Sequence, residues 1–291
     1  MKISGHTRLF AVLGHPISHT KSPAFQNPGL QALGLDAVYL ALDVHPDRLI
    51  PTLRSMADMG FAGCNLTIPH TEIAFQGVDR LSPEARRAAS VNTIVFHPDG
   101  TLEGHSTDGY GLATAVTEAF GQGFEGRDLL LLGCGGAGRA AAREAAERGA
   151  AALWLANRNP ARAADLAAEL RSQFPRLNVH ACAAWPPAAD EVRAADLILN
   201  ATAIGMKPGD ASPLSASAFT PDQSVLDMVY VDPVTPLMRA AQEAGARAVN
   251  GLGMLLHQGC RSLEIWTGQP APVEIMRNAL WQAVYGEAAH V

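Results

Sequence analysis

Lysine is scarce in this chain, and no run of basic residues occurs in it. The 22 basic residues include lysine only at Lys2, Lys21 and Lys207, and arginine supplies the rest. The formal net charge is −6 and the isoelectric point is about 5.9. Because a nucleic-acid-binding surface needs clustered positive charge, this composition argues against nucleic acid as the main partner.

Long apolar runs are also missing. No segment is long and apolar enough to span a bilayer, so we expect no membrane partner. The stretch MKISGHTRLFAVLGHP at the start of the sequence has too short an apolar run and carries histidine and arginine. We therefore expect no targeting signal and a cytoplasmic protein.

Cysteine is rare and lacks the spacing of a metal or disulfide framework. The four cysteines are far apart and form no CxxC pair: Cys64, Cys134, Cys182 and Cys260. His15 and His19 are four residues apart, but Pro16 between them prevents a helical pair of metal ligands. We therefore expect no metal site and a reducing compartment.

What the sequence does contain is a long alternation of strand-like and helix-like segments. Its 291 residues are 48% hydrophobic, which favours two ordinary domains with ample cores. Strands are expected at residues 8–13, 37–42, 63–68, 93–96, 101–104, 128–132, 152–156, 178–181, 197–200 and 224–229. Helices are expected at residues 23–33, 46–59, 82–89, 108–120, 139–148, 161–171, 236–244, 251–266 and 273–284. Strands separated by helices in this way predict an α/β fold with parallel βαβ units.

A glycine-rich turn lies at residues 129–140, LLLLGCGGAGRA. Gly133, Gly135 and Gly138 match the G-x-G-x-x-G spacing, directly after a strand and before an alanine-rich helix. The first glycine permits the tight turn, the second lets backbone amides approach a pyrophosphate, and the third permits close packing of helix on sheet. The pattern predicts a Rossmann dinucleotide site at a helix N-terminus.

The end of the next strand bears on the choice of dinucleotide. NAD-binding versions carry a carboxylate there for the ribose hydroxyls. Here the strand at residues 152–156 ends in Asn157 and Arg158, and Arg162 follows one helical turn later. An arginine fork attracts a 2′-phosphate. We therefore expect NADP(H) rather than NAD.

Several polar segments at predicted strand ends resemble the shikimate dehydrogenase family in order and spacing. The segments are GHPISHTKSP (14–23), NLTIPHT (65–71), VNT (91–93), GHSTDG (104–109), NRNPAR (157–162), NATAIGM (200–206), DMVYVDPVTPL (227–237) and NGLGMLLHQG (250–259). They cover nearly the whole chain, and several are independent of the general Rossmann pattern.

The resemblance implies an enzyme of aromatic amino-acid biosynthesis (the chorismate pathway) that uses NADPH to reduce 3-dehydroshikimate to shikimate. It implies an N-terminal α/β substrate domain at residues 1–107 and a Rossmann NADP domain at residues 108–250. The helices of residues 251–291 return to the first domain. The only partners expected are these small molecules, with the chain a monomer or a homodimer.

The resemblance also assigns site residues. The implied substrate contacts are Thr20, Ser22, Thr67, Asn92, Asp108, Tyr230 and Gln258. The implied cofactor contacts are Gly133, Gly135, Gly136, Ala137, Gly138, Asn157, Arg158, Arg162, Thr202, Met228, Gly251 and Met254. The chemistry is suitable, because hydroxyl and amide side chains both donate and accept hydrogen bonds to a hydroxylated ring acid. A carboxylate such as Asp108 can hold a ring hydroxyl by a charge-assisted hydrogen bond.

One position departs from the family pattern N-V-T-x-P-[FH]-K. Its lysine works with the aspartate of N-T-D-G, here Asp108, and supplies a positive charge and a proton to the developing alkoxide. The lysine position is occupied by Thr71, which has no charge and a poorly acidic hydroxyl. Since acid–base catalysis contributes roughly 10²–10⁴-fold, we expect a loss of that order.

Three explanations of Thr71 stay open. It is an engineered substitution that traps substrate and cofactor, or a natural one for which Lys21 or His70 compensates through water. Alternatively, it marks a protein that has become an enzyme for a different ligand or a binding module, such as one that senses shikimate and NADPH without turnover. Quinate is an alternative substrate, because Thr20 replaces the first serine of the family S-x-S-P motif and adds a methyl group. Arg158 argues against the NAD preference expected of many quinate enzymes.

Overall fold

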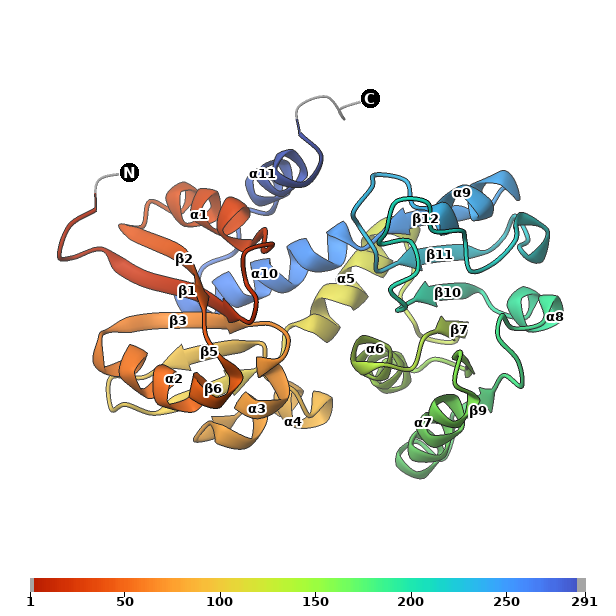
Figure 1. The fold of residues 1–291 in the computed structure, drawn as a ribbon, viewed down its shortest axis with the longest axis horizontal. Helices are drawn as coiled ribbons and strands as arrows, with labels where there is room; N and C mark the ends of the chain where they lie inside the picture. The colour runs from red at the N-terminus through yellow and green to blue at the C-terminus, as the bar shows by residue number, and fades with distance from the viewer. Residues whose placement is uncertain (1–2, 287–291) are drawn as a thin grey trace. The chain divides into compact units, whose positions relative to one another are not determined.

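The structure, a computed structural model, describes residues 3–286 and divides into two compact units (Figure 1). The first unit contains the described residues up to Gly111 and from Leu255 onward, and the second is Leu112–Met254. The divisions pass through helices α5 (Asp108–Phe120) and α10 (Leu252–Thr267), a few residues after the boundaries expected from the sequence. Within residues 3–286, no helix combines the length and apolarity that a bilayer crossing requires.

The first unit is built on a mixed sheet with the strand order β2-β1-β3-β5-β6-β4. The strands are β1 (Arg8–Gly14), β2 (Ala37–Asp43), β3 (Phe61–Leu66), β4 (Arg80–Leu81), β5 (Thr93–Phe96) and β6 (Leu102–His105). Strands β2, β1 and β3 are parallel, whereas β5 is antiparallel to both β3 and β6. The strands expected at residues 93–96 and 101–104 therefore pair as a hairpin, while the short strand β4 was not expected.

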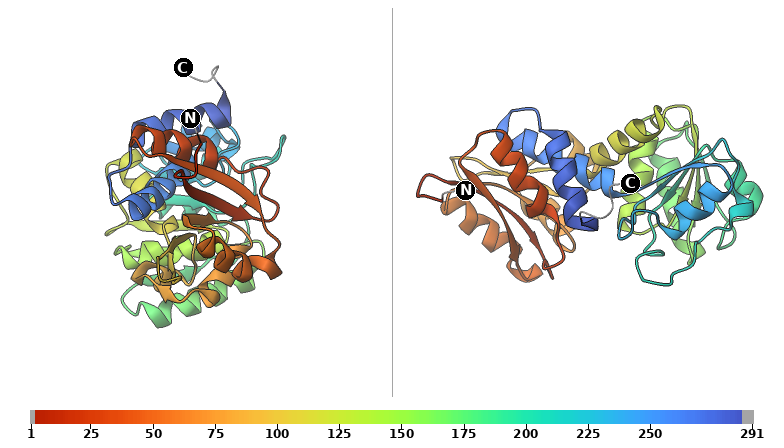
Figure 2. Two further views of the ribbon diagram at one scale, coloured as in Figure 1. Left: turned by 90° about the vertical axis from the view of Figure 1, so that its left-hand side faces the viewer. Right: turned by 90° about the horizontal axis from the view of Figure 1, so that it is seen from above.

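Helices cover both faces of this sheet (Figures 1 and 2). Helices α1 (Ser22–Ala32), α10 and α11 (Val273–Tyr285) lie on one face, and α2 (Leu49–Asp58), α3 (His70–Gly77) and α4 (Pro83–Ala88) on the other. Adjacent residues of β1 face opposite sides: Phe10 contacts Trp266 of α10, and Ala11 packs in the cluster with α2. Burial on both sides explains why β1 reads as a continuous apolar run.

The helix expected at residues 46–59 is interrupted. Pro46–Arg48 forms a 3₁₀ turn, η1, before α2 begins at Leu49. The side chain of His45 accepts a hydrogen bond from the Asp47 N–H and caps this turn. Proline has no N–H and fits the first turn of a helix, which places the start here. The apolar periodicity of the segment then belongs to α2 alone.

The second unit is a parallel sheet with the order β12-β11-β10-β7-β8-β9. The strands are β7 (Asp128–Leu132), β8 (Ala152–Ala156), β9 (Asn178–Ala181), β10 (Leu197–Asn200), β11 (Ser224–Asp227) and β12 (Arg247–Asn250). The order reverses between β7 and β10, which is the topological switch point of a doubly wound Rossmann sheet. Strand β12 was not expected from the sequence, because none of its residues is fully buried and it lacks an apolar pattern.

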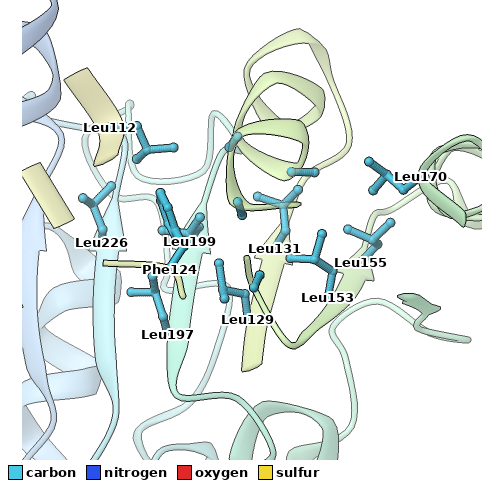
Figure 3. Packing of buried hydrophobic residues seen from close by; sticks show 14 of the residues in the cluster. Leu112, Phe124, Leu129, Leu131, Leu153, Leu155, Leu170, Leu197, Leu199 and Leu226 are labelled. Atoms are coloured by element: carbon cyan, nitrogen blue, oxygen red, sulfur yellow. The ribbon is translucent and has the colours of Figure 1, made fainter. Parts of the chain in front are cut away.

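Each face of this sheet has its own core. Leu129 and Leu131 point to the side of α5, α6 (Gly136–Glu147) and α7 (Pro160–Gln173), as Figure 3 shows. Leu130 and Leu132 point to the side of α8 (Ala189–Arg193), the 3₁₀ turn η2 (Ala216–Ala218) and α9 (Pro236–Glu243). Because these strands are buried on both faces, their sequence bounds were predicted closely.

Candidate functional site

The glycine-rich turn lies between β7 and α6 in the second unit. Gly133 has a φ of +98°, and a Cβ there would lie 2.9 Å from Thr202 Cγ2. A Cβ on Gly138 would run into the carbonyl oxygen of Gly133. Both positions therefore require glycine, one for its backbone conformation and one for its close approach. The space that a Cβ would take at Gly135 and Gly136 is open, which leaves the N-terminus of α6 accessible to an anion.

A pocket of about 170 Å³ lies beside this turn, at the carboxyl ends of β7, β8 and β10. Its lining consists of Gly133, Gly135, Asn157, Arg158, Arg162, Trp185, Ala201, Thr202 and Ala203. No carboxylate is among them. Arg158 and Arg162 are exposed, and neither forms an ion pair within residues 3–286. The donor set fits a phosphorylated dinucleotide better than one with free ribose hydroxyls.

Short hydrogen bonds fix the backbone around the pocket. Asn157 Oδ1 accepts a hydrogen bond from the Cys134 N–H at 3.0 Å, which ties the end of β8 to the glycine turn. Thr202 Oγ1 donates to Asn200 Oδ1 at 2.7 Å, and Asn200 Nδ2 donates to Asp227 Oδ1 at 2.8 Å. Burial raises the pKa of Asp227. Asn200 and Asp227, which had no role in the sequence-based assignment, thereby hold Thr202 at the pocket.

The other predicted cofactor residues lie along the same edge of this sheet. The Met228 N–H donates to the carbonyl oxygen of Asn200 at 2.9 Å. A Cβ on Gly251 would run into the backbone of Met228, so only glycine fits there. Ala137 belongs to the first turn of α6, and Met254 lies at the end of the unit, packed on the core beside α5. The structure thus places all predicted cofactor residues in the second unit.

In the first unit, a pair of hydroxyls marks the start of α1. Thr20 Oγ1 donates to Ser22 Oγ at 3.3 Å, and the Ser22 N–H donates to Thr20 Oγ1 at 3.3 Å. Both side chains are half-buried, whereas Lys21 between them is exposed. Hydroxyl donors beside the N-terminus of a helix make a suitable place for a carboxylate.

A second group of polar residues forms a buried hydrogen-bond network around Asn65. Tyr39 donates to Asn65 Oδ1 at 2.7 Å. Asn65 Nδ2 lies 2.9 Å from Ser262 Oγ and 3.0 Å from the carbonyl oxygen of Asn92. The side chain of Asn65 thus forms its hydrogen bonds within the fold, where β3, β5 and α10 meet. It is a structural hub and does not face a ligand.

Asp108 is held by Asn92. Asn92 Nδ2 donates to Asp108 Oδ1 at 2.7 Å, and Asn92 Oδ1 accepts from the Thr107 N–H at 2.9 Å. Burial raises the pKa of Asp108, and the hydrogen bond from Asn92 partly opposes that rise. Asn92 is buried and its amide is satisfied within the fold, so it holds Asp108 while Asp108 Oδ2 stays available.

Thr71 lies in the first turn of α3, and its carbonyl oxygen accepts a hydrogen bond from the Val91 N–H at 3.1 Å. This bond places Thr71 beside the segment that carries Asn92. Thr67 is half-buried at the end of β3, and its carbonyl oxygen accepts from the His70 N–H at 2.8 Å. His70 is fully buried, and burial is the main cause of its lowered pKa, so its ring is neutral near pH 7.

The last two predicted substrate contacts lie in different units. Gln258 in α10 belongs to the first unit and donates from Nε2 to the Leu255 carbonyl at 2.8 Å. Tyr230 follows β11 in the second unit, half-buried, and burial raises its pKa. The structure brings Asn92, Thr107 and Asp108 together, and Thr20 with Ser22.

Sequence reasoning missed Tyr39, Thr93, Thr107, Ser262 and Trp185. For two of them a signal existed. Thr107 precedes Asp108 inside the GHSTDG segment, and Ser262 is four residues after Gln258, on the same face of a helix. Ser262 Oγ indeed donates to the Gln258 carbonyl at 3.0 Å. Tyr39 and Trp185 lie outside the motifs, and only the folded chain brings them to these sites.

Comparison with known proteins gives the geometry a family context. Residues 12–94 match the family model described as the shikimate dehydrogenase substrate binding domain. Residues 251–280 match the shikimate 5′-dehydrogenase C-terminal domain. The shikimate dehydrogenase (NADP(+)) of Methanopyrus kandleri is 40% identical over 285 residues, covering 96% of this chain and 97% of its own.

Solved structures of other proteins have a similar fold over nearly the whole chain. Shikimate 5-dehydrogenase from Thermus thermophilus, in complex with NADP(H) and shikimate, has a TM-score of 0.83 and 36% identity, covering 95% of this chain and 99% of its own. Quinate dehydrogenase from Corynebacterium glutamicum, in complex with NAD, has a TM-score of 0.86 and 26% identity, covering 95% and 99%.

Proposed function

Because the chain belongs to the shikimate dehydrogenase family, we propose that it is an NADP-dependent dehydrogenase that interconverts 3-dehydroshikimate and shikimate. Residues 1–107 with 251–291 bind the ring acid, and residues 108–250 bind the dinucleotide. The observation that carries the proposal is the hydrogen-bonded network from Tyr39 through Asn65 to the Asn92–Asp108 pair. This network holds Asp108 in the same unit as the Thr20 and Ser22 hydroxyls, the proposed carboxylate-binding end.

The chemistry of the substrate end follows from its donors. Thr20 and Ser22 offer hydroxyls to the substrate carboxylate at the N-terminus of α1. Thr67 and Gln258 offer neutral groups that donate or accept hydrogen bonds to ring hydroxyls. Asp108 Oδ2 faces the hydroxyl or ketone that reacts.

The cofactor end is supported by the arginines of the pocket. Arg158 and Arg162 hold the 2′-phosphate of NADP(H), while the turn from Gly133 to Gly138 receives the pyrophosphate at the start of α6. When bound, NADPH supplies the hydride that reduces the ketone. Thr202, Met228, Gly251 and Met254 border the same end of the sheet and position the nicotinamide half.

Thr71 lowers the rate of this reaction relative to enzymes with lysine at the same position. An ammonium group would stabilise the charge on the developing alkoxide, and a threonine hydroxyl cannot. We expect roughly 10²–10⁴-fold slower turnover than a lysine-containing counterpart. Neither alternative donor is well suited: His70 is buried with a lowered pKa, and Lys21 is exposed next to the carboxylate site.

Quinate is the second candidate substrate, and one residue favours it. The Thr20 methyl group changes the shape of the carboxylate site, where shikimate and quinate differ in ring geometry. The quinate dehydrogenase of similar fold was solved with NAD, whereas the pocket of this chain presents Arg158 and no carboxylate. The cofactor preference therefore separates the two candidates.

The deciding experiment is steady-state oxidation of shikimate and of quinate, each with NADP and with NAD, by this protein and by Thr71→Lys. We expect shikimate with NADP to be the best pair and Thr71→Lys to raise kcat by about 10²–10⁴-fold. Calorimetric binding of shikimate and NADPH without any turnover in either protein would favour a sensor. A clear preference for NAD would contradict the role of Arg158.

A further inference from the structure

The two carboxylate oxygens of Asp108 have different surroundings. Asn92 Nδ2 donates to Oδ1 at 2.7 Å. The positions of the oxygen and nitrogen of the Asn92 amide are fixed by a backbone donor. Asn92 Oδ1 accepts from the Thr107 N–H at 2.9 Å, and this N–H can only donate. The oxygen of Asn92 therefore faces Thr107, and its nitrogen must face Asp108.

Further contacts hold the Asn92 amide in this orientation. Thr93 Oγ1 donates to Asn92 Oδ1 at 3.0 Å, and Thr93 Oγ1 lies 2.8 Å from Ser262 Oγ. Asn65 Nδ2 donates to the Asn92 carbonyl oxygen at 3.0 Å. All of these side chains are buried, with at most 7% exposed. Rotation of the amide would leave several buried polar groups without partners, which is strongly unfavourable.

The fixed donor determines where a proton can reside on Asp108. Oδ1 is committed as an acceptor, so a proton on this carboxyl is carried by Oδ2. The side chains hydrogen-bonded around Asp108 are neutral: Asn92 donates to Asp108 and to Thr107. Thr71, whose carbonyl oxygen accepts from the Val91 N–H beside Asn92, adds no charge. No charged group within residues 3–286 contributes to the shift of the Asp108 pKa, which burial raises.

The titratable side chain of His105, on the strand before α5, does not interact with Asp108. His105, at the end of β6, has a pKa lowered mainly by burial, and its charged neighbours are Glu103, Glu84 and Arg261. Asp108 is not among them. In a chain with lysine at position 71, an ammonium would oppose the rise of the Asp108 pKa. Thr71 removes that opposition.

We propose that Asp108 is by itself the acid and base of the reaction, with Oδ2 as the atom that exchanges the proton. The inference rests on the proposed function. In reduction, the hydride that NADPH would supply leaves a C–H bond of the reduced nicotinamide and forms the new C–H bond at the ketone carbon, and the C=O π electrons move to oxygen. The Asp108 O–H bond breaks, and its proton forms the product hydroxyl. The carboxylate left behind takes a proton from solvent, and oxidation reverses each step.

Asn92 is a positioning residue in this scheme, supported by Ser262. By occupying Oδ1, Asn92 directs the proton to the oxygen that meets the substrate. Ser262 acts through Asn65 and Thr93, which hold the amide. Replacement of Ser262 is expected to alter proton transfer more than substrate binding. The value of kcat should then fall, while the KM for shikimate stays near its original value.

A spectroscopic test needs neither substrate nor turnover. The infrared spectrum of this protein minus that of Asp108→Asn, recorded as a function of pH, isolates the carbonyl stretch of protonated Asp108. We expect this band to persist above pH 3.8, the ordinary value for aspartate, and to disappear at lower pH in Thr71→Lys than in this protein. An Asp108 band that is lost near pH 3.8 would overturn the proposal.

The kinetic test uses the pH dependence of both directions. Oxidation needs the carboxylate, so kcat/KM for shikimate falls as pH decreases through the Asp108 pKa. Reduction needs the acid, so its rate falls as pH rises through the same value. Asp108→Asn is expected to lose about 10²–10⁴-fold in both directions. Ser262→Ala is expected to shift the midpoint, and Ser262→Thr, which keeps the hydroxyl, to restore it.

The outcomes separate this inference from the proposed function. An infrared band above pH 3.8 with no turnover of shikimate or quinate would overturn the proposed substrate, and with it the role of Asp108 in that reaction. Turnover that survives Asp108→Asn would overturn the role of Asp108 while the proposed function stands. A matching midpoint in the infrared and kinetic titrations supports both.

Discussion

The hydroxyl of Tyr39 donates a hydrogen bond to Asn65 Oδ1 across 2.7 Å, in the buried interior of the first unit. Tyr39 is on β2 and Asn65 on β3, and β1 lies between the two strands. The ring of Tyr39 also packs near Trp266, with centroids 6.1 Å apart. The side chain of Tyr39 therefore takes part in both the polar network around Asn65 and the apolar packing around Trp266.

Tyr39→Phe is expected to reduce the free energy of unfolding by about 1–3 kcal/mol, because Asn65 Oδ1 loses its donor while it stays buried. Thermal or urea denaturation measures the loss. Tyr110→Phe, at an exposed tyrosine of α5, is the matched control. Equal stability of the two variants would contradict a structural role for the Tyr39 hydroxyl.

The glycines of the turn are expected to separate into two classes. A methyl group at Gly138 would overlap the Gly133 carbonyl, so Gly138→Ala is expected to cost about 1–3 kcal/mol of stability. A methyl group at Gly136 meets open space, so Gly136→Ala is expected to leave stability unchanged or raise it by about 0.4–1 kcal/mol.

The variants Gly138→Ala and Gly136→Ala also test where the pyrophosphate binds. If the open space above Gly136 is its place, Gly136→Ala weakens NADP binding although the fold is intact. Denaturation and calorimetric titration of NADP, run on both variants, give the two readouts. A Gly136→Ala variant that binds NADP as tightly as this protein would place the pyrophosphate elsewhere.

The sequence predicted the second unit more closely than the network of the first. Strands such as Asp128–Leu132 and Ala152–Ala156 are apolar and buried on both faces, so local composition marks them. The structural role of Asn65, in contrast, could not be predicted from the sequence. Its partner Ser262 is 197 residues away along the chain, and no local pattern records such a contact.

The hydrogen-bonding role of Asn92 could not be predicted from the sequence for the same reason. The motif around it indicated a contact with the substrate, and a single amide can serve either a ligand or the fold. Its partners Thr107 and Asp108 are 15 and 16 residues away, beyond the range of turn and helix signals. Only the folded arrangement of β5, β6 and α5 shows that the amide is already satisfied.

Arg158 is expected to determine the choice between NADP and NAD. Arg158→Ala removes a charge-assisted hydrogen bond to the 2′-phosphate, which is worth about 1.5–3 kcal/mol, or roughly 10- to 150-fold in affinity. The Kd for NADP should rise by that factor, while the Kd for NAD should change little. Calorimetry with both dinucleotides measures the ratio.

Arg176→Ala provides the control for the loss of one exposed arginine in the same unit. It should change neither affinity. An Arg158→Ala variant that retains full discrimination against NAD would show that Arg162 alone, or another group, recognises the phosphate. The double variant with Arg162→Ala would then distinguish these cases.

Trp185 is expected to form an aromatic wall for the adenine ring. It is half-buried and lines the pocket together with Arg158 and Arg162, so a base bound there meets a flat apolar surface beside two guanidinium groups. Stacking of a base on an aromatic side chain is worth about 1–3 kcal/mol. Trp185→Ala should therefore weaken NADP binding by roughly 5- to 150-fold, and Trp185→Phe by less.

Tryptophan fluorescence measures this contact without turnover. Because a stacked purine quenches an indole, NADP should quench the emission of this protein, and Trp185→Phe should abolish most of the quench. Trp281→Phe, in α11 of the first unit, should leave the quench intact. If Trp185→Ala binds NADP normally, or if Trp281→Phe removes the signal, the adenine ring does not stack on Trp185, and the pocket beside Arg158 holds only the phosphate.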